Sequence, residues 1–361
     1  MKVQRVCIPE TDTVSWFVLG DDFLPIQPIH SFLRYLENLE RSPNTIRAYA
    51  GHLKLYWEYL TSIQLDWTKV RLSELAEFVA WLREPEPGVI LLQEHEAKRS
   101  ESSINAILAA VTSFYDFHQR DGTAGDIPLY REQFLPHRRY KSFLHHITKR
   151  KKARSRLIKL KVRPKQHKTL TKTQIDTLVA ACHRVRDRFL LRLLAETGMR
   201  IGQALGLRHE DVVSWDNEIR IVPRKANTNR VRSKALEPYT VHVTQGLMEL
   251  YTDYLLNEFG EIDSDYVFVN LWDGSIGEPI TYSNAIDLFR RLSKKTGIQV
   301  HPHMLRHTHA TELIRSGWDA AKVQKRLGHA DVQTTLNIYT HLEDVDLKKA
   351  HEELQAKEQK R

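Results

Sequence analysis

Residues 301–313 read HPHMLRHTHATEL and place several histidines and an arginine within a few helical turns. His303 and Arg306 are three residues apart, so a helix would project them from one face. His303 and His307 are four apart, a spacing found in zinc-binding helices. The metalloprotease pattern needs a glutamate directly after the first histidine, however, and Met304 stands there. No carboxylate or cysteine cluster elsewhere completes a metal site, so the alternative for this stretch alone is histidines with an ordinary structural role.

Two further stretches flank this one along the chain, TGMRIGQALGL at 197–207 and LGHADVQTTLNIYTHL at 327–342. In the first, Gly198 is expected to end one helix and to place Arg200 at the start of the next. A guanidinium held on a rigid corner is suited to bidentate phosphate recognition. In the second, Tyr339 follows a histidine by ten residues, and taken alone it could be an ordinary aromatic of an amphipathic helix.

A basic hairpin is predicted between the first two of these stretches. The strand-like pieces EIRIVP and YTVHV lie on either side of RKANTNRVRSK, at 224–234. Lys225 follows directly on the first strand, and Lys234 is a second lysine near the same hairpin. Lysines in exposed turns are commonplace, so neither residue indicates a function without further support; of the two, Lys225 is favoured by its position.

Composition favours a partner that carries negative charge. The formal net charge is +9, and every Lys, Arg, Asp or Glu residue between Glu132 and Asp176 is basic. Such self-repulsion has no folding benefit and suits a polyanion, so we expect nucleic acid as the partner. The alternative is a solvated run of charge.

Cysteine content and hydropathy indicate a soluble protein of a reducing compartment. Cys7 and Cys182 are the two cysteines of the chain, far apart and without the spacing of a metal site, so neither a disulfide framework nor a zinc knuckle is expected. The amino terminus has no apolar leader, and no run of about 18 apolar residues occurs. The expectation is a cytoplasmic protein without membrane contact.

The chain has 361 residues, which is longer than a domain with a single hydrophobic core usually is, so we expect two domains. Helical patterns dominate, with Ser42 and Pro43 as a helix start, a capping box at Thr171 and Gln174, and one small sheet in the second half. The fold class is therefore mainly α. The predicted divisions are a strand-bearing N-terminal arm at 1–27, a helical domain at 28–130, a basic interdomain linker at 131–168 and a second domain with a helical tail at 169–361.

Six residues together resemble the tyrosine recombinase, or phage integrase, family. The stretch at 197–207 is similar to the family's first-arginine box, 301–311 to its histidine–arginine box and 327–342 to its box of histidine and nucleophile. SPNTIRAYAGHLKLYWEYL, at 42–60, is similar to the family's helical core-binding domain. The matching residues are Arg200, Lys225, His303, Arg306, His329 and Tyr339. The chain departs from the pattern at Gln203, where many members have an acidic residue, and KANTN lacks the glycine common beside the family's lysine.

The resemblance implies a SAM-like core-binding domain and a mostly helical catalytic domain with a small β-sheet, which close as a C-shaped clamp around DNA. It implies that Tyr339 attacks a phosphodiester to form a 3′-phosphotyrosine, while Arg200 and Arg306 clamp the phosphate and His329 donates a further hydrogen bond. Lys225 would protonate the leaving 5′ oxygen, and His303 would orient the site or accept the tyrosine proton. Because these residues supply the charge, no metal or nucleotide cofactor is expected.

The implied activity is site-specific recombination for the integration or transposition of a mobile element. The implied partners are double-stranded DNA, further copies of the chain in a homotetramer on paired sites, and accessory transposition proteins, with the protein on the nucleoid when bound. The segment after Leu342 is expected to dock on a neighbouring protomer. Two alternatives remain: a type IB topoisomerase, and a DNA-binding protein that retains an inactive recombinase fold, against which the completeness of the six residues argues.

Overall fold

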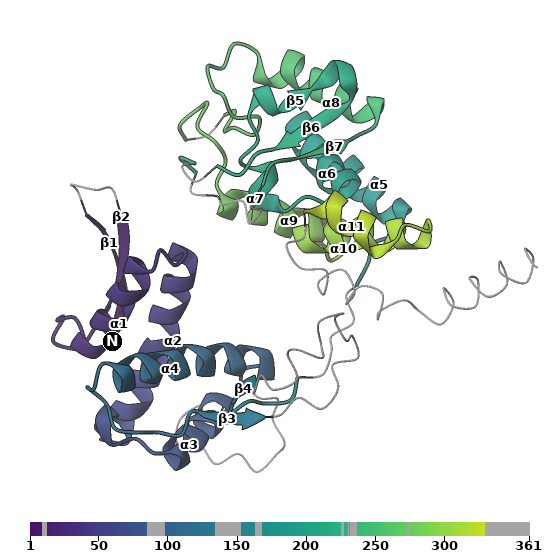
Figure 1. Cartoon of the computed structure of the whole chain (residues 1–361). Helices are drawn as coiled ribbons and strands as arrows, with labels where there is room; N and C mark the ends of the chain where they lie inside the picture. The colour runs from purple at the N-terminus through teal and green to yellow at the C-terminus, as the bar shows by residue number, and fades with distance from the viewer. Residues whose placement is uncertain are drawn as a thin grey trace, which may run out of the picture. The chain divides into compact units, whose positions relative to one another are not determined.

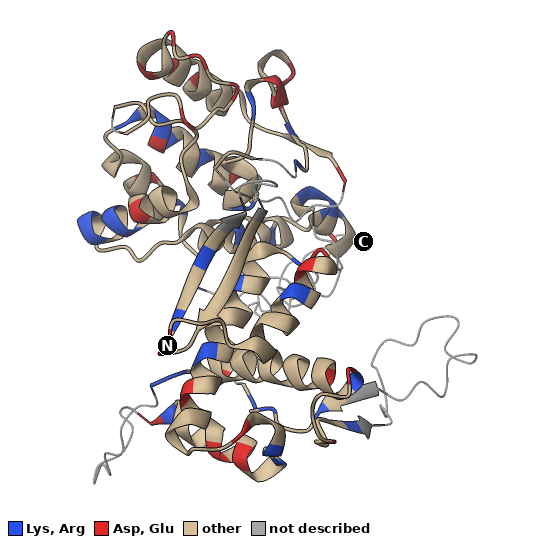
Figure 2. Ribbon diagram, turned by 90° about the vertical axis from the view of Figure 1, so that its left-hand side faces the viewer, with Lys and Arg blue, Asp and Glu red and all other residues tan. Residues whose placement is uncertain are grey.

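A computed structural model of the chain describes residues 1–8, 13–84, 98–133, 153–162, 168–224, 227–229, 231, 237–272 and 274–328. They belong to two compact units, Met1–Pro164 and Lys165–Arg361 (Figure 1). Lys and Arg occur beside Asp and Glu on the described helices (Figure 2). None of the described helices is long and apolar enough to cross a membrane.

The first unit is a helical bundle built around α2 (Pro43–Ser62) and α4 (Glu101–Arg120), with α1 (Gln27–Asn38) and α3 (Leu72–Arg83) packed beside them. The predicted start of α2 is confirmed, because the Ser42 side chain accepts a hydrogen bond from the Thr45 N–H at 3.2 Å. The helices share one apolar core. Inside it the Tyr56 and Tyr115 hydroxyls are 2.7 Å apart, and Tyr115 donates to the Trp67 carbonyl, so these buried hydroxyls are satisfied.

The described part of the first unit also includes two antiparallel strand pairs. β1 (Lys2–Ile8) pairs with β2 (Thr13–Leu19), and Val18 of β2 is buried in the helical core, so the N-terminal arm packs on the bundle. β3 (Tyr130–Gln133) pairs with β4 (Ala153–Arg156). After β4, the Leu160 backbone exchanges two 2.9 Å hydrogen bonds with the Asn105 side chain on α4. This part of the predicted linker region therefore lies along the first unit.

The second unit surrounds the buried helix α6 (Val185–Thr197), five of whose apolar residues are fully buried: Phe189, Leu190, Leu191, Leu193 and Leu194. Its small antiparallel sheet has the order β5 (Val212–Val213), β6 (Glu218–Ile221) and β7 (Tyr239–His242). The other α-helices in the described part of this unit are α5 (Lys172–Ala181), α7 (Ile201–Ala204), α8 (Gln245–Tyr254), α9 (Tyr282–Thr296), α10 (Pro302–Arg315) and α11 (Ala320–Leu327). The predicted mainly α fold with one small sheet in this half is confirmed.

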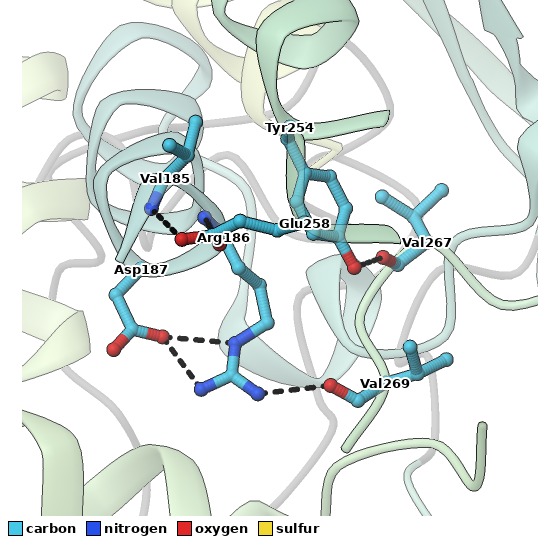
Figure 3. Close-up of polar contacts among 7 residues, drawn as sticks. All are labelled: Val185, Arg186, Asp187, Tyr254, Glu258, Val267 and Val269. Carbon is cyan, nitrogen blue, oxygen red and sulfur yellow. Dashed lines mark hydrogen bonds and ion pairs between the residues drawn. The ribbon is translucent and has the colours of Figure 1, made fainter. Parts of the chain in front are cut away.

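Contacts from distant parts of the unit hold the N-terminal end of α6 (Figure 3). The Glu258 carboxylate accepts hydrogen bonds from the backbone N–H groups of Val185 and Arg186, both at 2.9 Å, and so caps a helix that lacks a capping side chain of its own. The Arg186 guanidinium is bound to Asp187 and donates to the Val269 carbonyl at 2.9 Å. These contacts fix the start of α6 within the second unit.

Candidate active site

The turn after α6 places Arg200, as the sequence predicts. Gly198 ends α6 in the left-handed conformation, with φ +63°, and Arg200 occupies the N-cap of α7. The Arg200 backbone N–H donates to Gln203 Oε1 at 2.8 Å, which fixes the main chain below the guanidinium. Burial lowers the pKa of Arg200. Its buried Nη1 has no hydrogen-bond partner among the described residues, so this donor is free to meet a ligand.

Arg306 enters the same site from α10 and is only 5% exposed. Its Nη1 donates to the Gly198 carbonyl at 2.6 Å, and its Nη2 donates to the Leu327 carbonyl at 3.0 Å. These carbonyls close α6 and α11, where the helix dipole places partial negative charge. Burial, and then the nearby Arg200, lower the pKa of Arg306 to about 9. The side chain is thus still cationic at neutral pH.

The two guanidiniums form a site ready for an anion. Arg306 is buried and Arg200 half-buried, and the charge of Arg200 disfavours that of Arg306. A phosphate group would relieve this repulsion and could accept the remaining N–H donors in bidentate fashion. The arrangement can therefore bind a phosphodiester and stabilise the charge that develops on it when it is attacked.

Tyr239 and Gln203 lie beside this arginine pair, and the roles of both were missed from the sequence. The Tyr239 hydroxyl is 3.2 Å from Gln203 Nε2 and 3.3 Å from the carbonyl oxygen of Leu327. Arg306, Arg200 and Arg326 all act on the phenol electrostatically. The only signal in the sequence was the unusual Gln203; nothing in YTVHV singles out the tyrosine.

His303 stands one helical turn before Arg306, and its side chain is exposed while that of Arg306 is buried. The ring centroids of His303 and His307 are 6.5 Å apart. Within the described ranges, no group of three or more histidine, cysteine, aspartate or glutamate residues could hold a metal ion. The structure thus places His303 at the solvent-facing side of the helix that carries Arg306.

Lys225, His329 and Tyr339 lie outside the described residues, as does Lys234. Their chain neighbours are nevertheless placed. Gly328, directly before His329, ends α11 in the left-handed conformation beside Tyr239. Arg224, directly before Lys225, is bound to Asp211 and Glu210. Sequence prediction and structure thus bring together Arg200 and Arg306, with His303 on the same helix.

The conformation of Gly328 leads to a testable expectation about the turn before His329. Its φ is +61°, and a Cβ atom there would lie 2.6 Å from the Tyr239 ring. Gly317 has φ +81° with open space around the same position, so it serves as the control. We expect Gly317→Ala to lower the free energy of unfolding by about 1–2 kcal/mol, the cost of a left-handed alanine. Gly328→Ala should cost more and should also slow DNA cleavage.

Denaturant unfolding and a DNA-cleavage assay measure these two effects. Equal losses of stability in the two alanine variants, with cleavage unchanged in both, would show that the Tyr239 ring does not set the position of this turn.

A cavity of about 240 Å³ lies elsewhere in the second unit and contains none of the predicted site residues. Its lining comes from the start of α6, the loop before α9 and α9 itself, and includes Arg186, Asp187, Asp287 and Arg291. Its cationic and anionic side chains balance, unlike the arginine pair, so it is a weaker candidate for binding a phosphate.

Comparison with known proteins finds relatives along nearly the whole chain. The sequence pattern of the phage integrase family matches residues 168–345, and that of the phage integrase N-terminal SAM-like domain matches residues 29–122. Transposase A from transposon Tn554 of Staphylococcus aureus is 45% identical over 350 residues, which cover 96% of either chain. Tyrosine recombinase XerD of Halalkalibacterium halodurans is 27% identical and covers 87% of the chain and 92% of its own.

Solved structures share the fold. The Tn1549 transposon integrase in complex with transposon right end DNA matches with a TM-score of 0.61 at 17% identity, covering 91% of the chain and 99% of its own. The XerH site-specific recombinase bound to palindromic difH substrate matches with a TM-score of 0.58 at 22% identity, covering 85% and 78%. At such identities the likeness concerns the fold alone.

Proposed function

Because the chain belongs to the phage integrase family of tyrosine recombinases, we propose that it cuts and rejoins double-stranded DNA at specific sites to move a transposon. The observation that carries this proposal is the pair of guanidiniums beside two helix ends, of which Arg306 is buried and Arg200 half-buried. The 45% identity to a transposase along nearly the whole chain favours transposition as the purpose of the reaction. A double-stranded DNA partner also accounts for the basic stretch between Glu132 and Asp176.

In the proposed reaction, the Tyr339 hydroxyl oxygen attacks the scissile phosphorus and the bond from phosphorus to the 5′ oxygen breaks. The tyrosine proton passes to His303 or to water, and Lys225 gives a proton to the leaving 5′ oxygen. Arg200 and Arg306 stabilise the charge on the non-bridging oxygens. The product is a 3′-phosphotyrosine and a free 5′-hydroxyl.

The covalent intermediate retains the energy of the phosphodiester bond. The 5′-hydroxyl of a second DNA strand can therefore attack the phosphotyrosine and rejoin the strands without ATP. Arginine and lysine side chains supply the positive charge, and the chemistry requires no metal from outside the protein. Exchange between two DNA sites requires paired active sites, and we propose a homotetramer for this purpose, with the segment after Leu342 docking between protomers.

The contacts of Arg224 support Lys225 as the proton donor. Arg224 is bound in bidentate fashion to Asp211, with N–O distances of 2.7 and 2.9 Å, and also to Glu210 at 2.6 Å. Asp211 is only 2% exposed. The residue directly before Lys225 is therefore anchored in the body of the unit.

A substrate with sulfur in place of the bridging 5′ oxygen tests the role of Lys225. A thiolate leaves without protonation, so it needs no general acid. We expect Lys225→Ala to slow cleavage of ordinary DNA by about 10²- to 10⁴-fold and to cleave the sulfur substrate at a rate close to that of the unaltered protein. Lys234→Ala is the matched control and should cleave both substrates normally. If Lys234→Ala behaves in the way expected of Lys225→Ala, the assignment of the two lysines is reversed.

The function as a whole is tested with a duplex that spans one end of the element and carries a nick next to the scissile phosphate. The short 5′-hydroxyl fragment then diffuses away and traps the covalent complex, which is separated on a denaturing gel and mapped by peptide mass spectrometry. An adduct on Tyr339 is expected. Relaxation of supercoiled DNA without paired sites would instead favour a type IB topoisomerase, and the absence of any adduct would reject the proposal.

A further inference from the structure

The hydroxyl of Tyr239 joins parts of the second unit that are far apart in the sequence. Tyr239 lies on β7, Gln203 on α7 and Leu327 at the end of α11. The oxygen of the hydroxyl is 3.2 Å from Gln203 Nε2, 3.5 Å from Gln203 Oε1 and 3.3 Å from the Leu327 carbonyl oxygen. These distances connect the cap below Arg200 with the turn that leads to His329.

The hydroxyl has one proton, so the direction of each hydrogen bond can be assigned. Gln203 Oε1 already accepts from the Arg200 N–H at 2.8 Å, and this fixes the amide with its Nε2 as the donor to Tyr239. The Tyr239 proton is then directed to the Leu327 carbonyl. That carbonyl also accepts from Arg306 Nη2 at 3.0 Å, so both of its lone pairs are used.

The protonation state of the phenol agrees with this assignment. Burial raises the pKa of Tyr239, although Arg306, the hydrogen bond from Gln203, Arg200 and Arg326 all act to lower it. The net direction is upward, so the phenol keeps its proton at neutral pH and remains a donor. The ring itself lies where a Cβ atom on Gly328 would be, which fixes the turn sterically as well.

This network gives a reason for glutamine at position 203. A glutamate there could still accept from the Arg200 N–H, but it has no N–H to offer to Tyr239. Its carboxylate would instead attract the single Tyr239 proton, because charge-assisted hydrogen bonds are the stronger ones. The Leu327 carbonyl would then lose one of its two donors. Gln203 and Tyr239 are therefore matched to one another.

We propose that Tyr239, oriented by Gln203, is a positioning residue of the DNA-cleavage site that holds the end of α11 against Arg306. The inference rests on the proposed function for the chemistry that it serves. The tyrosine itself does not touch the reacting atoms; it acts through the Leu327 carbonyl, the Gly328 turn and Arg306.

Tyr239→Phe tests this role, because it keeps the ring against Gly328 and removes only the hydroxyl. Tyr254→Phe is the matched control, since Tyr254 is also buried and donates to a carbonyl, that of Val267, at 2.8 Å (Figure 3). We expect Tyr239→Phe to slow single-turnover cleavage of the nicked duplex about tenfold, the effect of one hydrogen bond, with DNA affinity changed less than twofold. Tyr254→Phe should lower thermal stability and leave the cleavage rate unchanged.

Gln203→Glu, alone and combined with Tyr239→Phe, tests whether the two residues act through one proton. Alone, Gln203→Glu should slow cleavage by a factor similar to that of Tyr239→Phe. In the Tyr239→Phe background it should cost less than about threefold more, because the proton that it diverts is already missing. Losses that multiply fully would show that Tyr239 and Gln203 act independently, which contradicts the proposal.

Hydrogen exchange provides a readout that does not require cleavage. The amides of residues 320–328 should exchange faster in Tyr239→Phe than in the unaltered protein or in Tyr254→Phe. Unchanged exchange there, or equal cleavage rates in the two phenylalanine variants, would overturn the inference. If the unaltered protein forms no adduct on Tyr339, the proposed function fails, while the exchange comparison still decides whether Tyr239 holds the turn.

Discussion

Replacing Tyr339 by phenylalanine is expected to abolish the covalent complex with DNA. The substitution removes one oxygen atom, the proposed nucleophile, and keeps the ring, so folding and DNA affinity should be retained. Water should not replace the tyrosine efficiently as the nucleophile, because the proposed site orients and activates the Tyr339 hydroxyl and not a water molecule. We expect the rate of single-turnover cleavage to fall by about 10⁴-fold or more, as observed when enzymes lose a nucleophile. The nicked duplex and a denaturing gel measure this directly.

Tyr282→Phe is the control for this experiment. Tyr282 is half exposed at the start of α9, and its loss should affect neither DNA binding nor adduct formation. A gel-shift titration on intact duplex establishes that the Tyr339→Phe protein still binds. If that protein forms the adduct at a normal rate, another residue is the nucleophile, and peptide mapping of the adduct would identify it.

The sequence predicted those parts of the site that depend on local structure. Gly198 indicated the end of a helix, and the structure confirms that Arg200 follows it in the turn. The predicted helix with His303 and Arg306 is confirmed as α10; their spacing predicted that both project from one face, and in the structure His303 is exposed while Arg306 is buried. Such features depend on residues close to one another in the chain, where glycine, proline and helical periodicity act.

The network around Tyr239 could not be predicted from local patterns. Its hydroxyl contacts a carbonyl 88 positions away and an amide 36 positions away. Periodicity places a tyrosine on a strand, but it does not tell which helix end the strand will meet. The same holds for the contact of Arg306 with Gly198, across 108 positions. The family resemblance identified Arg306 as a site residue, but it did not indicate which carbonyls this arginine contacts.

For the site residues outside the described ranges, the predicted roles rest on the family resemblance alone. Lys225, His329 and Tyr339 stay predictions, each adjacent to or following a described anchor: Arg224 for the lysine, and Gly328 for the other two. In the chain, Arg224 lies between Arg200 and Arg306, whereas Gly328 follows Arg306 at the end of α11. Biochemical tests of these three residues are therefore needed to establish their roles in catalysis.

Arg306→Lys is expected to have the second largest effect on catalysis. Lysine keeps the positive charge, but a single ammonium cannot reach the Gly198 and Leu327 carbonyls and still donate two parallel hydrogen bonds to a phosphate. Loss of one charged donor to a transition state commonly slows a reaction by about 10²- to 10³-fold. At least one buried carbonyl would also be left without its donor, at a cost of about 1–3 kcal/mol in the free energy of unfolding. Single-turnover cleavage and denaturant unfolding measure the two effects separately.

Arg186→Lys distinguishes catalysis from stability in this comparison. Arg186 is also largely buried and also donates to a carbonyl, that of Val269, but it lies at the far end of α6 from the arginine pair. Its replacement should lower the free energy of unfolding and leave the cleavage rate within about threefold of normal. If Arg306→Lys loses stability as Arg186→Lys does and still cleaves at a comparable rate, Arg306 only ties two helix ends together. A rate loss confined to Arg306→Lys would mean that the same guanidinium that joins α6 to α11 also binds the phosphate, so that folding of the unit itself assembles the site.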